Sequence, residues 1–530
     1  MGIDVFNDVN TEIIIGNPGC GKTTTLVNKV KELIDRGISP TDIAYFSFSV
    51  AAVEEAISRT MKACNKEREE FPFFRTIHSM AFTLLGLNTQ QVMQGYHIID
   101  FGKLHGLKFS APTIDRAKRG TMPAFKDDAY MECINVSRLL DMSIREYMTT
   151  HNKDFADVAE VETLAIEYER YKKAKGLYDY TDMLLLANKA MVTIPKFKYM
   201  IIDEAQDLST MQWLIVEKLA EKTSHIIIAG DDKQTINEFA GADLEYFLNI
   251  KAHITVLKQS YRVPKKVYNM ANRLVEKMSR KRPSTWVPRE EEGSIRRVDE
   301  LPLEDMRRDS WLVLARTNSQ LQRLREQLIG NLGVICPLYL INEEMPVDKE
   351  VFKAISLFKA LGNLRCNPNS KIRDKYTALA IDPDNDTLEM RKRKINNIML
   401  FKKFINSEMP ASVELDDHFA EQYSKKNWID AFDKIPLQDR LYIARVLPHY
   451  EKDNDIYKKA RIRLCTIHGA KGSEADNVVL FTSVTPTQRR LIANGDDSEL
   501  RLLYVAITRT KKNLYLLNSN RKNLSYIDLL

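Results

Sequence analysis

The stretch IIIGNPGCGKTTTLV, residues 13–27, combines an apolar run, a glycine-rich turn and a lysine followed by threonines. Its apolar, β-branched start is typical of a buried strand, and GNPGCGKT fits the pattern G-x-x-x-x-G-K-[ST]. The residues that follow have helical spacing, with apolar side chains on one face at Leu26, Val30 and Leu33. Strand, glycine-rich loop and helix in this order predict a phosphate-binding P-loop.

The loop also predicts chemistry. Glycines allow backbone N–H groups to curl around phosphates, and the helix N-terminus adds positive potential. We expect Lys22 to reach the β- and γ-phosphates and Thr23 to hold Mg²⁺. The predicted nucleotide-binding residues of the loop are Gly16, Asn17, Pro18, Gly19, Cys20, Gly21, Lys22, Thr23 and Thr24.

A second motif narrows the reaction. In KYMIIDEAQDLS, residues 198–209, an apolar run ends in Asp203 and Glu204. Asp203 at a strand end can face Mg²⁺, and Glu204 can polarise an attacking water, which favours hydrolysis. In a third segment, SHIIIAGDDKQ, Gln234 follows another predicted strand and could sense the γ-phosphate. A P-loop kinase, which would transfer phosphate to a small molecule, is a separate alternative.

Composition limits the remaining classes. The chain has 530 residues, enough for about three or four domains, with 44% hydrophobic and 28% charged residues. Its formal net charge of +6 mildly favours a polyanionic partner. Scattered cysteines without a CxxC pair predict a reducing compartment, no disulfides and no zinc site: Cys20, Cys64, Cys133, Cys336, Cys366 and Cys465. With no signal peptide or apolar membrane span, we expect a cytoplasmic protein, or one in the host cytoplasm if viral.

The order of motifs resembles the UvrD/Rep/PcrA-like helicases of superfamily 1. IAYFSFSVAAVEEAISRT looks like motif Ia, TIHSMAF like Ib, DEAQD like II and GDDKQTINEFAGA like III. LKQSYRVP looks like motif IV, TIHGAKGSEADNVVL like V and LLYVAITRTKKNL like VI, while LYDYTDMLLLA matches a stretch before motif II. The match covers most of the chain.

This resemblance implies roles for further residues. Arg262 and Arg509 fall at the family's γ-phosphate arginines, which makes them catalytic candidates beside Lys22, Asp203, Glu204 and Gln234. Glu474 matches a residue near the ribose, whereas Lys471 is expected to be structural or near DNA rather than catalytic. The implied single-strand contacts are two stacking aromatics, Phe48 and Phe239, and four backbone-contact positions, Thr76, His78, Thr466 and His468.

The sequence also departs from the family pattern. No glutamine motif, which reads adenine in the family, lies in the stretch MGIDVFNDVN before the first strand. Ala51 replaces the lysine of motif Ia, and motif III carries Asn237, Phe239 and Ala240 in place of tyrosine, tryptophan and arginine. We therefore expect a smaller electrostatic share in DNA binding.

Motif order predicts an α/β fold of two RecA-like parallel-sheet lobes, each interrupted by a mainly helical insertion. The expected first lobe covers residues 1–80 and 178–255 with insertion 81–177, and the second covers 256–345 and 456–530 with insertion 346–455. A basic run in the second insertion could touch duplex DNA or form a solvated helix face: Arg391, Lys392, Arg393, Lys394, Lys402 and Lys403.

The expected function is an ATP-dependent, 3′-to-5′ single-stranded DNA translocase and helicase that uses ATP and Mg²⁺ between its lobes. The direction comes from the resemblance alone. The alternative is a DNA-stimulated ATPase that displaces DNA-bound proteins with little unwinding. Expected partners are single-stranded DNA, single/double-strand junctions and replication or repair proteins, with the chain a monomer or weak oligomer.

Overall fold

The computed structural model describes residues 4–8, 10–110, 127–151, 153, 155–190, 195–335, 339–341, 351, 354–355, 427–450, 460–518 and 525–530. The chain divides into two compact units. The first comprises Met1–Glu300, Leu314–Asn318 and Thr466–Leu530, and the second Leu301–Val313 and Ser319–Cys465. The predicted second insertion falls largely outside the described residues, and its basic run at 391–394 and 402–403 lies wholly outside them.

The first sheet has six strands in the order β3-β2-β4-β5-β1-β6, and every neighbouring pair is parallel. Its strands are β1 (Asn10–Gly16), β2 (Ile43–Ser47), β3 (Phe74–Thr76), β4 (Phe197–Asp203), β5 (Thr223–Gly230) and β6 (His253–Leu257). The central strands are continuous apolar runs because both faces of the sheet are covered. Strand β6 extends to Leu257, two residues past the predicted end of the first lobe at residue 255. The predicted domain limits stay predictions.

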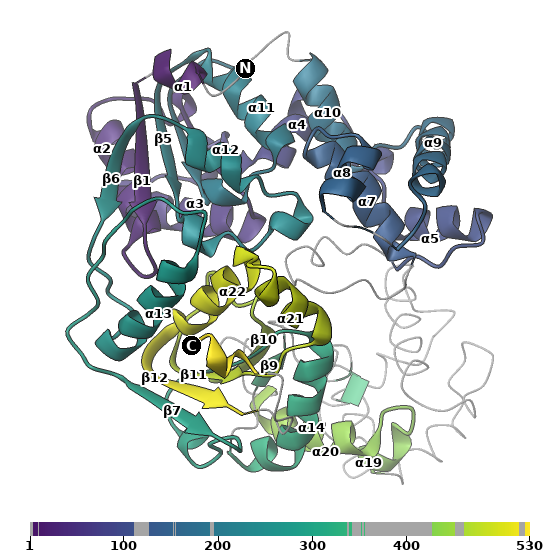
Figure 1. The fold of residues 1–530 in the computed structure, drawn as a ribbon, viewed down its shortest axis with the longest axis vertical. Helices are drawn as coiled ribbons and strands as arrows, with labels where there is room; N and C mark the ends of the chain where they lie inside the picture. The colour runs from purple at the N-terminus through teal and green to yellow at the C-terminus, as the bar shows by residue number, and fades with distance from the viewer. Residues whose placement is uncertain are drawn as a thin grey trace, which may run out of the picture. The chain divides into compact units, whose positions relative to one another are not determined.

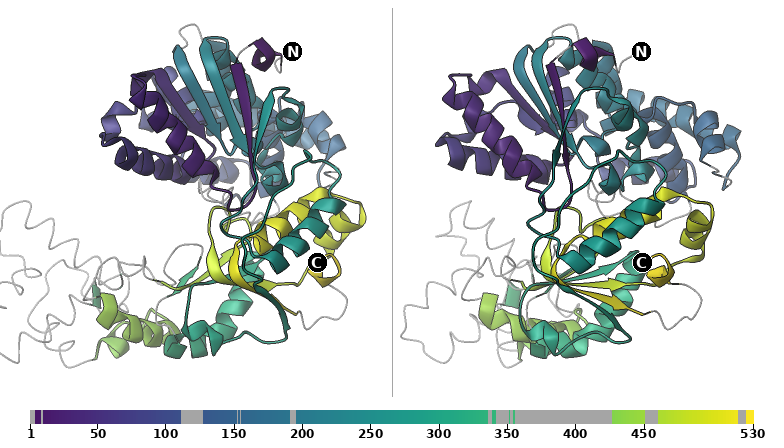
Figure 2. Two further views of the ribbon diagram at one scale, coloured as in Figure 1. Left: turned by 90° about the vertical axis from the view of Figure 1, so that its left-hand side faces the viewer. Right: turned by 60° about the vertical axis from the view of Figure 1, so that its left-hand side comes forward.

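Helices pack on both faces of this sheet and form two apolar cores (Figures 1 and 2). One face is covered by α2 (Lys22–Asp35) and α3 (Val50–Cys64). The other is covered by α1 (Val5–Asp8), α4 (Ile77–Leu84), α10 (Tyr180–Ala190), α11 (Thr210–Ala220) and α12 (Leu244–Asn249). Because the strands are parallel, the carboxyl ends of β1 and β4 lie at the same end of the sheet, where they carry the P-loop and the Asp203–Glu204 pair.

A helical segment with its own core lies between α4 and α10. Its helices are α5 (Gly95–Leu104), α7 (Asp128–Leu139), α8 (Ile144–Thr150) and α9 (Val158–Lys175). An ion-pair cluster ties it to the start of α10, since Arg138 and the fully buried Lys172 both pair with Asp179 and Asp182. The helical character predicted for this region is therefore present in its described residues.

The second sheet has the strand order β7-β12-β11-β8-β10-β9. Its strands are β7 (Ser294–Val298), β8 (Trp311–Ala315), β9 (Tyr339–Ile341), β10 (Ile462–Thr466), β11 (Ala475–Phe481) and β12 (Thr510–Leu517). The described α-helices of this part of the chain are α13 (Lys265–Lys277), α14 (Asn318–Ile335), α19 (Trp428–Ala431), α20 (Leu437–Tyr450), α21 (Pro486–Ala493) and α22 (Asp497–Ile507). Two parallel sheets with covering helices confirm the predicted α/β class.

Short 3-10 helices complete the described elements: η1 (Pro40–Asp42), η2 (Arg68–Glu70), η3 (Thr89–Gln91), η4 (Ala205–Asp207), η5 (Asp232–Gln234), η6 (Glu238–Ala240), η7 (Asp305–Arg307) and η9 (Tyr526–Asp528). Three of them, η4, η5 and η6, follow the carboxyl ends of β4 and β5, and two of these contain predicted site residues, Gln234 in η5 and Phe239 in η6.

Candidate active site and nucleic-acid interface

The P-loop joins the end of β1 at Gly16 to the start of α2 at Lys22. Gly19 has a φ of +72°, and a Cβ added there would lie 2.4 Å from Cβ of Arg262, so both backbone conformation and space require glycine. The first N–H groups of α2 have no acceptor within the helix and form an anion-binding end. Thr24 is exposed, and its hydroxyl accepts a hydrogen bond from Arg59.

Lys22 contacts both predicted carboxylates. Its Nζ donates to Oε1 of Glu204 at 2.6 Å and lies 3.5 Å from Oδ1 of Asp203. Burial would lower the pKa of Lys22, but the two carboxylates outweigh it and raise that pKa above its ordinary value. Burial would raise the pKa of the Glu204 carboxyl, but the positive charge of Lys22 holds that pKa below its usual range. Lys22 and Glu204 are therefore both charged.

The same residues fit a nucleotide phosphate and Mg²⁺. The Asp203 carboxylate and the Thr23 hydroxyl are oxygen donors of the kind that Mg²⁺ prefers. Two buried polar atoms in this region, Nδ2 of Asn17 and Oγ of Ser47, have no hydrogen-bond partner among the residues that the structure describes. Lys22 and the loop amides would supply positive charge and N–H donors to the phosphates.

A glutamine and an arginine link distant parts of the chain at this site. Oε1 of Gln234 accepts from Nη2 of Arg509 at 2.7 Å, and Nε2 of Gln234 donates to Asp231 at 2.7 Å. Arg509 is 2% exposed, and burial, with the nearby Arg262 adding to it, lowers its pKa to about 9. Gln206, a residue the motif reading left unassigned, donates to Oε2 of Glu204 at 2.6 Å and orients that carboxylate.

The segment SYRV lies directly on the P-loop. Oγ of Ser260 donates to the carbonyl of Pro18 at 2.7 Å, and N–H of Tyr261 donates to the carbonyl of Gly19 at 2.9 Å. Nε of Arg262 donates to Glu474 at 2.6 Å, and Glu474 also pairs with Lys511 at 2.5 Å. The structure therefore brings the predicted phosphate arginine and the predicted ribose residue together beside the loop.

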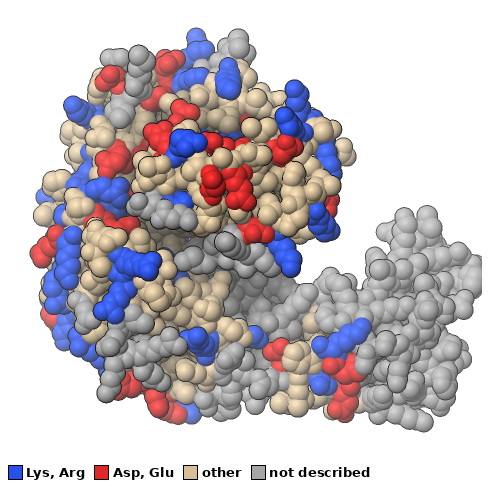
Figure 3. Space-filling view, turned by 45° about the vertical axis from the view of Figure 1, so that its right-hand side comes forward, with Lys and Arg blue, Asp and Glu red and all other residues tan. Residues whose placement is uncertain are grey.

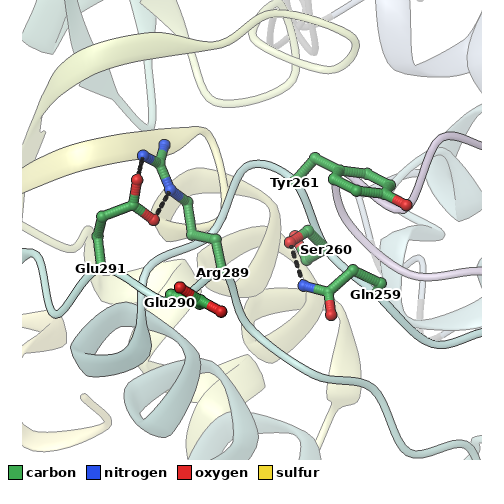
Figure 4. A pocket seen from close by; sticks show the side chains of 6 residues that line it. All are labelled: Gln259, Ser260, Tyr261, Arg289, Glu290 and Glu291. Carbon is green, nitrogen blue, oxygen red and sulfur yellow. Dashed lines mark hydrogen bonds and ion pairs between the residues drawn. The ribbon is translucent and has the colours of Figure 1, made fainter.

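A hollow of about 630 Å³ opens beside this segment (Figure 4). Its lining residues are Gln259, Ser260, Tyr261, Arg289, Glu290 and Glu291. Tyr261 is 74% exposed, with its ring unburied next to the P-loop. Tyr261 was not among the predicted site residues. The signal that could have identified it is an aromatic residue directly before Arg262, in the loop that follows β6.

Lys471 lies on the nucleotide side rather than apart from it. Its Nζ donates to Asp207 and to the carbonyl of Gln234, the latter at 2.9 Å, and it lies 3.8 Å from Oε2 of Glu204. The predicted role of Lys471 is structural or near DNA, and it stays a prediction. The structure shows an ammonium that bridges the motifs around Glu204 and Gln234.

The two aromatic residues predicted to stack on bases lie outside the apolar cores. Phe48 follows the end of β2, is half-buried and belongs to neither core of the first sheet. Phe239 lies on η6 and is 40% exposed. Its ring packs edge to face on His468 with ring centres 5.2 Å apart, so two predicted contacts from distant motifs meet.

The remaining predicted contact positions have local roles in the fold. Thr76 is 9% exposed, and its hydroxyl caps α4 by accepting from N–H of Ser79 at 3.1 Å. Thr466 is fully buried, and its hydroxyl accepts from N–H of Gly469 at 3.2 Å. His78, whose pKa burial lowers to about 4, has its ring edge to face with Tyr180, a 41%-exposed aromatic that sequence reasoning left unassigned.

Surface charge is mixed. On the face drawn in Figure 3, lysine and arginine side chains are interspersed with aspartate and glutamate over the described residues. Among the described residues, no helix is long and apolar enough to cross a membrane.

A P-loop, a carboxylate pair at the end of a neighbouring parallel strand and two arginines from later segments define a P-loop nucleoside triphosphatase. Two sequence models match the chain: the UvrD/REP helicase N-terminal domain over residues 5–255 and the UvrD-like helicase C-terminal domain over residues 356–521. The chain belongs to this family, the UvrD/Rep-like ATP-dependent DNA helicases.

Relatives agree with this membership over nearly the full length. The chain is 21% identical to the ATP-dependent DNA helicase PcrA of Bacillus subtilis (strain 168), over 97% of this chain and 81% of the relative. It is 22% identical to PcrA of Staphylococcus aureus (strain MRSA252), over 98% of this chain and 84% of the relative. A solved structure described as the PRRSV helicase aligns with 98% of this chain and 54% of its own chain, at 11% identity and a TM-score of 0.33.

Proposed function

We propose that this chain is an ATP-driven translocase on single-stranded DNA that moves 3′ to 5′ and separates duplex strands ahead of it. Lys22 would bind the β- and γ-phosphates, and Glu204 would polarise the attacking water. Arg262 and Arg509 would stabilise negative charge that develops during hydrolysis, and Thr23 and Asp203 would hold Mg²⁺. We place this activity in the cytoplasm, with replication or repair proteins as candidate partners.

One observation carries the proposal: a single short loop after β5 contacts both predicted sites. At one end Gln234 accepts a hydrogen bond from Arg509, in the nucleotide site. Five residues further on, Phe239 packs on His468, where the strand is expected. Because Gln234 and Phe239 share one loop, a change in phosphate occupancy at Gln234 has a short covalent route to the aromatic that would contact a base.

Directional unwinding tests the proposal. Duplexes with a 3′ or a 5′ single-stranded tail are incubated with the protein, Mg²⁺ and ATP, and displaced strand is measured beside released phosphate. We expect displacement from the 3′-tailed duplex, phosphate release stimulated by single strands, and neither activity in Lys22→Ala. Equal displacement from both tails would overturn the direction, and phosphate transfer to a small acceptor would overturn the whole assignment.

Asn237 favours the second candidate, displacement of bound proteins with little unwinding. This residue occupies a motif III position where the family pattern has an aromatic, yet it is 8% exposed and donates to Asp207 at 3.0 Å. With Ala240 also lacking a cation, this loop offers one aromatic, Phe239, to a strand. Release of a protein block from single-stranded DNA, without strand displacement on either tailed duplex, would select this candidate.

A further inference from the structure

Strand β2 places a tyrosine hydroxyl in the core, directly behind the predicted metal ligand. Side chains alternate along IAYFS, so Tyr45 shares the α2/α3 face with Ile43, while Ala44 and Phe46 face the opposite core. Tyr45 is fully buried. Its hydroxyl donates to Oδ2 of Asp203 at 2.9 Å, across 158 residues of sequence.

The position of Tyr45 is held at two points. Its ring stacks on Phe74, with ring centres 5.1 Å apart and an interplanar angle of 15°. Its strand pairs with β4 in parallel register, so that Ser47 lies opposite Asp203. The hydroxyl therefore reaches forward along the sheet to a carboxylate at the strand end, and little freedom remains for it to reach another acceptor.

The two oxygens of Asp203 have different partners. Oδ2 accepts from Tyr45, while Oδ1 accepts from N–H of Glu204 at 2.8 Å and lies 3.5 Å from Nζ of Lys22. The Lys22 side is the side of the P-loop, where a nucleotide would bind. If Lys22 turned to a bound phosphate, Asp203 would lose this ion pair, and the hydrogen bonds from Tyr45 and Glu204 would remain to orient its carboxylate.

We propose that Tyr45 is a positioning residue, whose hydroxyl fixes the Asp203 carboxylate so that Oδ1 faces the Mg²⁺ of the bound nucleotide. This inference rests on the proposed role of Asp203 as a metal ligand. Hydrogen-bond partners of metal ligands orient them, and removal of one typically lowers metal affinity about 10–100-fold. A buried phenol without an acceptor is unfavourable, so the pairing also explains why a hydroxyl is tolerated in this core.

The test removes the hydroxyl and keeps the ring. Mn²⁺ is titrated into ADP-bound protein, and free Mn²⁺ is measured by electron paramagnetic resonance, so that the readout does not depend on turnover. The variants are Tyr45→Phe, Asp203→Asn and the matched control Tyr168→Phe, a buried tyrosine in the helical insertion. We expect about 10-fold weaker Mn²⁺ binding in Tyr45→Phe, a larger loss in Asp203→Asn and no change in Tyr168→Phe.

The two substitutions test the metal role of Asp203 and the positioning role of Tyr45 separately. Parent-like Mn²⁺ binding in Asp203→Asn would overturn the metal role of Asp203. Loss in Asp203→Asn with parent-like binding in Tyr45→Phe would overturn only the role of Tyr45.

Mg²⁺ dependence of ATP hydrolysis separates positioning from general damage. A positioning defect raises the Mg²⁺ concentration needed for half-maximal rate while kcat recovers at saturation; a lowered kcat with unchanged Mg²⁺ dependence would contradict it. Thermal unfolding of the nucleotide-free proteins reports folding. If Tyr45→Phe does not fold, Tyr45→His, which retains a donor, should bind Mn²⁺ more tightly than Tyr45→Leu, and equal binding would overturn the proposal.

Discussion

The predicted nucleotide residues and the predicted DNA residues are held in different ways. Around the P-loop, partners from distant segments hold one another: Lys22 with Glu204, Gln234 with Arg509, and Arg262 with Glu474. The predicted DNA residues divide into partly exposed rings, such as Phe239, and buried hydroxyls, such as that of Thr466, which bond to the chain itself.

This difference follows from what each site must do. Hydrolysis needs charges placed within a fraction of an ångström of the reacting phosphate, so each side chain requires supporting contacts. Binding a strand of any sequence needs only exposed π-faces and backbone-facing polar groups, which tolerate looser placement. We therefore expect large rate effects from substitutions at the first site and modest affinity effects at the second.

The largest effect is expected for Arg509→Ala. An arginine that stabilises transition-state charge contributes about 10³–10⁵ in rate, so ATPase activity stimulated by single-stranded DNA should fall by that order while DNA binding persists. Steady-state phosphate release measures this, and Arg273→Ala, at an exposed arginine on α13, is the control. Unchanged stimulated turnover in Arg509→Ala would remove this residue from the site.

Glu204→Gln should lower turnover by about 10²–10⁴ because the amide cannot act as the base for water. It should still bind ATP, since Lys22 and the loop stay intact, whereas Lys22→Ala should lose hydrolysis together with phosphate binding. Nucleotide binding and single-turnover hydrolysis distinguish the two variants. Near-normal turnover in Glu204→Gln would show that another group activates water.

Phe48→Ala and Phe239→Ala should each weaken single-strand binding by about 1–3 kcal/mol, with little preference among bases. Affinity measured at several salt concentrations should show an unchanged salt slope, because neither substitution removes a charge. Tyr96→Ala, at a 61%-exposed aromatic on α5, serves as the control. If both phenylalanine variants bind like the parent, the strand follows another path.

Acid should destabilise the fold through His468. Burial, with Arg316 and Lys471 nearby, lowers the pKa of this histidine to about 3, below that of an unfolded histidine. The unfolded chain then binds the extra proton as pH falls below about 6.5, so roughly 2 kcal/mol of stability should be lost between pH 7.5 and pH 5. Chemical denaturation at both pH values should show a smaller loss in His468→Gln; an equal loss would exclude this histidine as the source.

The smallest effect is expected for Thr76→Ala. Loss of the α4 cap should lower the free energy of unfolding by about 1 kcal/mol, and Thr76→Ser should retain it. Single-strand affinity should change less than in Phe239→Ala. If Thr76→Ala instead loses affinity like Phe239→Ala with no loss of stability, the hydroxyl contacts DNA rather than capping the helix.

Much of the fold was predictable because it depends on residue patterns within short segments of the chain. The strand, glycine loop and helix around Lys22 follow from residue spacing, and the apolar run before Asp203 predicts a strand that ends at the same sheet edge. The candidate nucleotide residues could be proposed for the same reason, since each stands in a short motif, and their roles stay predictions. The roles of Thr76 and Lys471 were not, because a cap and a bridging ammonium depend on what packs against them.

A P-loop ATPase with two parallel sheets, and the family to which it belongs, could be inferred from the order of residues along the chain. Which side chains meet depends on how the chain packs. Arg509 reaches Gln234 across 275 residues, and the Tyr45 hydroxyl reaches Asp203 because β2 pairs with β4 in a particular register. A shift of that register by one residue would turn Tyr45 to the opposite core. Partner identity therefore depends on packing and strand register, which residue spacing along one segment does not encode.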